Sequence, residues 1–157
     1  MSKPILIVGE SGSGKSRSTI NLDPQKTVLI RVERKELPYR GWLKKFKEMD
    51  TQMNGNMFTC KDYMKIKGFL KYVNYKMPNI ETIIIDDFQY LMVHEFMSQI
   101  PNKCTGSQVF DKYNSIGYNV YDLIEYSKTL RDDIFVVYMS HSDTDELGFT
   151  RCKTLVS

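Results

Sequence analysis

The residue pattern with the clearest chemistry in this chain lies close to its N-terminus. Residues 9–16 are Gly-Glu-Ser-Gly-Ser-Gly-Lys-Ser, a glycine followed by four residues and then Gly-Lys-Ser. This spacing is the phosphate-binding P-loop (Walker A) pattern, in which glycines let backbone N–H groups surround phosphate oxygens. An apolar run, 5–8, precedes it, and residues 16–21 can open a helix. This strand–loop–helix context favours nucleotide binding over a chance glycine-rich turn.

The individual positions of the motif predict separate contacts with a nucleoside triphosphate. The ammonium group of Lys15 would reach the β- and γ-phosphates, and the Ser16 hydroxyl would ligate Mg²⁺. The N-terminus of the following helix adds a partial positive charge at the same point. We therefore expect ATP and Mg²⁺ as cofactors. The predicted nucleotide-binding residues are Gly9, Ser11, Gly12, Ser13, Gly14, Lys15, Ser16 and Arg17.

A pair of carboxylates follows the most continuous apolar run of the chain. Residues 82–85 are Thr-Ile-Ile-Ile, which is typical of a strand buried on both faces of a parallel sheet, and Asp86 and Asp87 come directly after it. An aspartate in this position matches the Walker B pattern, so we predict that Asp86 holds Mg²⁺ opposite Ser16. The alternative is an aspartate that ends the strand and caps the next helix.

ATP hydrolysis also needs a group that orients or deprotonates the attacking water. Asp87 is one candidate, because it neighbours the predicted metal ligand. Glu33 is the other, because it follows the apolar segment 27–32 and its side chain is longer by one methylene group. We favour Glu33, since a longer side chain can extend along the sheet edge to the γ-phosphate.

The two histidines of the chain receive different interpretations. His141 follows the apolar segment 134–139 and could sense the γ-phosphate through a hydrogen bond. A solvent-exposed loop histidine is the competing interpretation. His94 falls inside a predicted helix, and we interpret it as structural.

These residues need a scaffold that brings them together, and the order of the predicted elements provides it. Apolar, β-branched segments alternate with helical patterns, which predicts an α/β fold with a mainly parallel sheet. Ligands of such sheets bind beyond the carboxyl ends of the strands, where the P-loop and the candidate side chains would lie. The predicted strands are 4–8, 27–32, 82–85 and 134–139, with shorter candidates at 58–60 and 149–155. The predicted helices are 16–21, 62–76, 88–97 and 110–130.

The composition is that of an ordinary globular protein, which we take as a single domain over residues 1–157. The net charge of +3 is too small to indicate nucleic-acid binding, although residues 31–76 hold twelve basic and five acidic residues. Three widely spaced cysteines lack metal-ligand spacing and are typical of a reducing compartment. Because the sequence shows no signal peptide and no membrane-spanning segment, we expect a cytoplasmic protein without a membrane partner.

The order of these motifs resembles the ATPase core of the RecA-like recombinases. In that family the P-loop strand is followed by strands that end in a catalytic glutamate, a Walker B aspartate and a polar nucleotide sensor. Glu33, Asp86 and His141 match these three positions. Segments 37–42 and 141–145 are also similar to those of small phage-encoded P-loop ATPases, some of which act as single-strand annealing recombinases. The resemblance implies a three-layer P-loop NTPase fold. Family members are longer, which leaves open whether this chain is truncated or is a small member without the C-terminal strands.

The resemblance also implies single-stranded DNA as a partner. The DNA-binding loops of the family match residues 98–113 and 142–149. The second loop departs from the family pattern, because it is acidic. In the first loop, the candidates for phosphate contact or base stacking are Lys103, Lys112, Phe110 and Tyr113.

Finally, the family assembles into rings or filaments in which a cation from a neighbour reaches the γ-phosphate. Arg151 and Lys153 match that position. We therefore expect a homo-oligomeric, Mg²⁺-dependent ATPase coupled to DNA recombination or repair. One alternative is a small nucleoside or nucleotide kinase, although the chain lacks a zinc ribbon and an arginine-rich lid. The other is a nucleotide-switched binding module with little turnover.

Overall fold

The computed structural model describes residues 1–99 and 107–154 of the protein, which form an α/β fold around one six-stranded sheet. The order of the strands is β1-β5-β4-β2-β3, and β6 pairs with β5. The β5–β6 pairing is antiparallel, and every other pairing is parallel. The strands are β1 (Lys3–Gly9), β2 (Thr27–Arg31), β3 (Met57–Thr59), β4 (Thr82–Asp86), β5 (Phe135–Thr144) and β6 (Thr150–Cys152).

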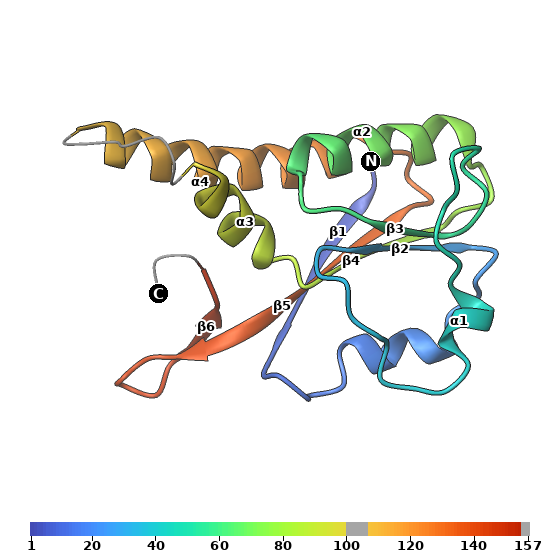
Figure 1. Ribbon diagram of the computed structural model, residues 1–157, viewed down its shortest axis with the longest axis horizontal. Helices are drawn as coiled ribbons and strands as arrows, with labels where there is room; N and C mark the ends of the chain where they lie inside the picture. The colour runs from blue at the N-terminus through green and yellow to red at the C-terminus, as the bar shows by residue number, and fades with distance from the viewer. Residues whose placement is uncertain (100–106, 155–157) are drawn as a thin grey trace.

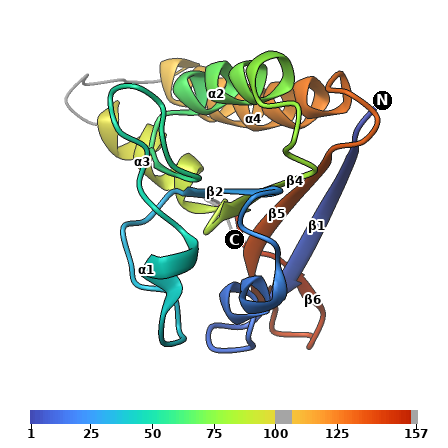
Figure 2. The same ribbon diagram turned by 90° about the vertical axis from the view of Figure 1, so that its right-hand side faces the viewer.

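Helical elements lie on both faces of the sheet, as Figures 1 and 2 show. Three long helices cover one face: α2 (Tyr63–Lys76), α3 (Tyr90–Ser98) and α4 (Ser107–Lys128). The other face carries the 3-10 helix η1 (Ser16–Asn21), the one-turn helix α1 (Trp42–Lys45) and the segment between β2 and α1. The predicted α/β fold with a mainly parallel sheet is confirmed.

The central strands β2 and β4 are buried on both faces, and their side chains alternate between two apolar clusters. Val28 and Ile30 of β2 pack with the long helices, whereas Leu29 packs with residues of the opposite face. The isoleucines of β4 alternate in the same way. This two-sided burial explains why neither strand carries a charged residue before its last position.

β1 forms one edge of the sheet and differs from the central strands. Among the described strands it pairs only with β5. Its apolar residues 5–8 remain 36–54 % exposed. The P-loop therefore follows an edge strand whose second side is open in the described part of the protein.

Most predicted elements are confirmed, including the start of α2. The Asp62 side chain accepts a hydrogen bond from the Lys65 N–H and caps that helix. The Ser16–Asn21 segment forms a 3-10 helix. No helix in the described part of the chain is long and apolar enough to cross a membrane.

Two predicted loops are shorter than the sequence suggested. β5 continues through the polar residues 140–144, because β6 pairs with residues 142–144 and satisfies their backbone groups. The second predicted DNA loop is therefore a β-hairpin whose turn spans about residues 145–149. α4 begins at Ser107, so the end of the first predicted loop is helical. The rest of that loop, residues 100–106, lies outside the described residues.

Candidate nucleotide-binding site

Four parallel strands end side by side and bring the candidate residues to one edge of the sheet. The register pairs Gly9 of β1 with His141 of β5, and Arg31 of β2 with Asp86 of β4. The P-loop, His141, the two aspartates and Glu33 therefore lie along the same edge, as the sequence predicts. The convergence follows from the shared direction of the strands, because carboxyl ends of parallel strands meet at one edge.

The P-loop closes around its own lysine. Gly12 and Gly14 have φ angles of +80° and +95°, a left-handed conformation that strongly favours glycine. The Lys15 ammonium donates to the carbonyl oxygens of Gly9 at 2.6 Å and Glu10 at 2.8 Å. Burial lowers the pKa of Lys15, while Asp86 and Asp87 oppose that effect and Lys35 adds to it. The lysine is thus held at the mouth of the loop, near two carboxylates.

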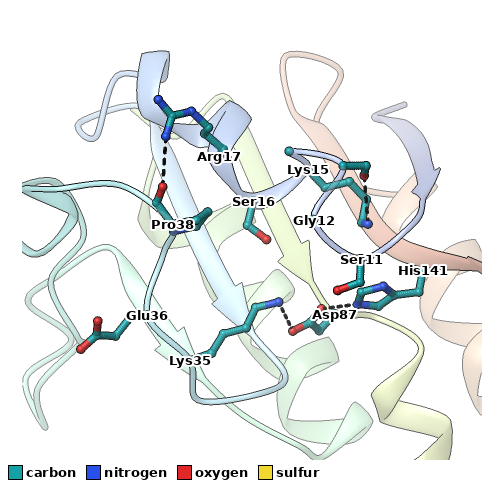
Figure 3. A pocket seen from close by; sticks show the side chains of 12 residues that line it. Ser11, Gly12, Lys15, Ser16, Arg17, Lys35, Glu36, Pro38, Asp87 and His141 are labelled. Carbon is teal, nitrogen blue, oxygen red and sulfur yellow. Dashed lines mark hydrogen bonds and ion pairs between the residues drawn. The ribbon is translucent and has the colours of Figure 1, made fainter.

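The P-loop lines a cavity of about 350 Å³, which is within the size range of small-molecule sites (Figure 3). Residues 11–17 form one wall, including the predicted Ser11, Ser13 and Arg17. Arg17 donates to the Pro38 carbonyl oxygen at 3.2 Å and so ties this wall to the segment after β2. The remaining lining residues are Lys35, Glu36, Pro38, Asp87 and His141.

The predicted magnesium ligands are in direct contact. The Ser16 hydroxyl lies 2.9 and 3.1 Å from the two carboxylate oxygens of Asp86. Asp86 is 2 % exposed, and its burial raises the pKa of the carboxyl group, with Lys35 acting in the opposite direction. A hydroxyl beside a carboxylate is a suitable pair of hard oxygen ligands for Mg²⁺, which usually binds one or two protein oxygens plus phosphates and water.

The described residues contain no group of three or more His, Cys, Asp or Glu side chains able to hold a metal ion. A Mg²⁺ ion held by Ser16, Asp86 and phosphate oxygens does not require such a group. The donor set therefore fits a nucleotide-bound Mg²⁺ ion rather than an independent metal centre.

Asp87 is buried in the same corner and is held by a lysine and a histidine side chain. Its carboxylate oxygens lie 2.5 Å from the Lys35 ammonium and 3.3 Å from His141 Nε2. Its φ angle of 59° is uncommon for a residue other than glycine and is a form of backbone strain found at functional sites. Both histidine and lysine also line the P-loop cavity (Figure 3).

No family model and no curated protein matches this chain. The function of the protein is therefore inferred from the chemistry of the edge just described. Glu33 and the contacts around it complete that edge.

Glu33 lies beside the P-loop cavity rather than in its wall. It lines an adjoining cavity of about 900 Å³, which shares Ser11, Lys35, Asp87 and His141 with the P-loop cavity. Its carboxylate contacts His94 Nε2, and the Lys61 ammonium lies 3.7 Å away. In this arrangement the carboxylate points to α3 and not to the P-loop.

Sequence analysis missed three residues of this edge. His94, interpreted as purely structural, contacts the candidate base from one turn inside α3. Lys35 reaches the aspartates from the segment after β2. Gln89 accepts a hydrogen bond from the His141 N–H at 3.2 Å, and its buried side-chain nitrogen has no partner among the described residues. For Lys35 and Gln89, a position a few residues after a strand end was the available signal, whereas His94 lies inside a helix and carried none.

Two of the residues proposed for DNA contact have contacts within the protein. Lys112 lies over the Phe96 ring at 4.2 Å, and Tyr113 stacks on the same ring at 5.6 Å. Both side chains belong to α4 and are engaged within the protein, whereas Phe110 of the same helix is 74 % exposed. Lys103 lies outside the described residues.

The acidic hairpin between β5 and β6 uses one of its carboxylates for its own turn. Asp145 accepts hydrogen bonds from the N–H groups of Leu147 at 3.0 Å and Phe149 at 2.9 Å. Arg151 of β6 is exposed and pairs in register with Asp143. Lys153 lines the larger cavity of its own chain.

Proposed function

We propose that the protein is a Mg²⁺-dependent ATPase with a RecA-like core. The observation that carries the proposal is the contact between Ser16 of the P-loop and Asp86 of the buried strand β4. Ser16 itself lines the cavity of about 350 Å³. The P-loop N–H groups would bind phosphate oxygens. The Lys15 ammonium would leave the two backbone carbonyl oxygens that it now contacts and bind phosphate oxygens as well. Ser16 and Asp86 would hold Mg²⁺, which neutralises charge on the β- and γ-phosphates when bound.

We assign the role of general base to Glu33. Asp87 is almost fully buried and both of its oxygens are held by Lys35 and His141. The Glu33 side chain is 32 % exposed and borders a cavity with room for the attacking water. A base that activates water needs access to water, and this favours Glu33. His94 holds the Glu33 carboxylate toward α3, and the carboxylate would have to turn toward the P-loop to reach the water.

Glu33→Gln tests this assignment against Asp87→Asn. We expect Glu33→Gln to lower the ATP hydrolysis rate by about 10²–10⁴-fold, the usual contribution of a general base, with ATP affinity retained. Phosphate release and nucleotide binding should be measured on the same preparations. An unchanged rate in Glu33→Gln together with loss in Asp87→Asn would move the role to Asp87. Unmeasurable turnover in the wild type with intact binding would support a nucleotide-switched module.

A second candidate is phosphoryl transfer to a small hydroxyl compound such as a nucleoside. It is favoured by the larger cavity, which adjoins the P-loop cavity and is lined by Gln89, whose buried amide nitrogen has no partner among the described residues. The same assay separates the two functions, because a kinase would form a phosphorylated nucleoside where an ATPase releases inorganic phosphate.

We further propose that ATP turnover is coupled to single-stranded DNA. Exposed aromatic side chains support this, since Phe110 on α4 and Phe149 in the hairpin turn are 74 % and 68 % exposed. Bases of single-stranded nucleic acid stack on such rings without regard to sequence. Arg151 lies close to Phe149 in the chain and supplies an exposed cation on the hairpin. The resemblance to recombinases also favours assembly of several copies of the chain.

A further inference from the structure

Lys35 occupies a central place in the site that the P-loop motif does not account for. It is two residues beyond Glu33, in the turn where the Lys35 N–H donates to the Glu33 carbonyl oxygen at 3.0 Å. Its side chain crosses the edge of the sheet toward β4, and it lines both the P-loop cavity and the larger one. Figure 3 shows its ammonium group directed at Asp87, across the cavity from the P-loop.

The carboxylates of two buried aspartates face this ammonium group. It lies 2.5 Å from an oxygen of Asp87 and 3.9 Å from an oxygen of Asp86. The two buried carboxylates thus receive positive charge from Lys35. A Mg²⁺ ion on Asp86 would supply that charge instead and weaken the attraction of Lys35 to the pair.

The lysine is also able to move. Its side chain is 42 % exposed, whereas the two aspartates are 3 % and 6 % exposed. Its backbone, by contrast, is fixed, because Arg31 donates to the Lys35 carbonyl oxygen at 2.9 Å. A long side chain with a fixed base and an accessible stem can exchange one anionic partner for another. His141 would remain 3.3 Å from Asp87 after such a movement.

We propose that Lys35 is a second phosphate-binding lysine, which leaves Asp87 and binds the terminal phosphate when Mg²⁺ and nucleotide enter the cavity. This deepens the proposed function and rests on it. Lys15 approaches the phosphates from the P-loop, and Lys35 would approach from the opposite wall. The terminal phosphate would then be held between two cations of the same chain.

The proposal differs from a purely structural role in which Lys35 only neutralises Asp87. A structural lysine would affect folding stability and would leave the preference for ATP over ADP unchanged. A lysine that binds the terminal phosphate contributes to ATP affinity and adds little to ADP affinity. The ratio of the two affinities is therefore the deciding measurement, and it does not depend on turnover.

The test is isothermal titration calorimetry of wild type, Lys35→Gln and Lys35→Arg with ADP and with a non-hydrolysable ATP analogue, in the presence of Mg²⁺. We expect Lys35→Gln to lower affinity for the analogue about tenfold or more and affinity for ADP less than threefold, with Lys35→Arg intermediate. Lys26→Gln is the matched control, because Lys26 is similarly exposed and ion-paired with Glu81 at 2.7 Å. We expect it to leave both affinities unchanged.

If Lys35→Gln lowers the affinities for the ATP analogue and for ADP equally, or lowers neither, the inference about Lys35 is overturned and the proposed function is not. Failure of the wild-type protein to bind either nucleotide would overturn the proposed function and the inference with it. If Lys35→Gln unfolds, the comparison rests on Lys35→Arg, which retains the charge but changes its geometry. An unchanged ratio of affinities in that variant would also overturn the inference.

Discussion

Side chains of both charges are concentrated at the strand ends, including two neighbouring carboxylates that repel each other. Two buried aspartates, two lysines and a histidine share one corner, and each carboxylate has a cationic or hydroxyl partner. Such a corner has little value for folding, because burying charge costs free energy. Its arrangement is understandable if a triphosphate and a divalent cation complete it.

Lys15→Ala removes the P-loop ammonium group that would contact the β- and γ-phosphates. We expect ATP affinity to fall by at least about 100-fold, since charge-assisted hydrogen bonds to a buried anion are lost. Folding stability should change little, because among the described residues the lysine donates hydrogen bonds only to P-loop acceptors. Equilibrium binding of a fluorescent ATP analogue measures the effect, and wild-type affinity in the variant would contradict the assigned role.

Asp86→Asn should raise the folding stability of the protein and abolish its Mg²⁺-dependent ATP binding. The folded-state pKa of Asp86 is raised above 3.8 by burial, so the folded protein binds this proton more tightly than the unfolded chain. The contribution of this group to stability is therefore most favourable below pH 3.8 and falls as pH rises through the raised pKa. At pH 7 the charged form costs stability, and the asparagine variant avoids that cost.

We accordingly expect Asp86→Asn to unfold at a higher temperature than wild type at pH 7 without Mg²⁺. A gain of about 1 kcal/mol would correspond to roughly 2–4 °C in a chain of this size. Mg²⁺-dependent ATP binding should be lost in the same variant. Asp122→Asn, which alters a partly exposed ion pair with Lys67, serves as the control. A lower melting temperature for Asp86→Asn would refute the argument.

At the scale of elements, the segment after β2 is held in place by one buried arginine. Arg31 is 4 % exposed and donates to Glu48 at 2.7 Å, Thr59 at 2.9 Å and the Lys35 carbonyl oxygen at 2.9 Å. It also lies 5.5 Å from the centre of the Trp42 ring. The arginine thus connects β3 and α1 to the turn that carries Lys35.

Replacement of Arg31 by leucine is expected to destabilise the protein by about 2–4 kcal/mol, since several hydrogen bonds from a charged group are lost together. ATP affinity should fall as well, because the Lys35 turn loses its anchor. Urea unfolding and calorimetry provide the two measurements. Glu48→Gln keeps an acceptor for Arg31 and should cost less than about 1 kcal/mol. Comparable losses in the two variants would show that Arg31 does not hold this segment.

Sequence reasoning succeeded for elements with continuous apolar runs and failed where polar residues form them. The buried strands β2 and β4 are marked by isoleucine and valine, and the P-loop glycines mark the turn between β1 and η1. The end of β5 is polar, and its pairing with β6 depends on backbone hydrogen bonds. The side-chain pattern of the sequence does not predict such bonds.

The contacts of Lys35 and His94 were not predictable for a related reason. Each joins a side chain to a carboxylate that follows a strand over 50 positions away along the chain. Residue types identify such groups as candidates, but only the arrangement of β2, β4 and α3 decides which carboxylate each one meets. The sheet edge that carries the site could be predicted from the sequence. The pairs of side chains that contact each other at this edge could not.

For the whole molecule, the main prediction concerns coupling to DNA. We expect single-stranded DNA to increase the ATP hydrolysis rate at low salt and to lose this effect steeply as salt rises, because phosphate contacts release counterions. Hydrolysis should be measured with and without a homopolymeric oligonucleotide across a salt series. Phe149→Ala should reduce the stimulation, and the partly buried Tyr39→Phe should not. Equal rates with and without DNA at every salt concentration would exclude the coupling.

The pairing of β1 with β5 has a consequence for the nascent chain on the ribosome. Gly9 is synthesised well before its neighbour in the sheet, His141, which lies 132 positions further along the chain. Long-range pairing of this kind forms late, after the intervening segments have been ordered. A translation intermediate that exposes the P-loop without β5 would lack His141 in the lining of the cavity, and we expect nucleotide not to stabilise it. Protection from proteolysis by ATP should therefore begin only once β5 has left the exit tunnel.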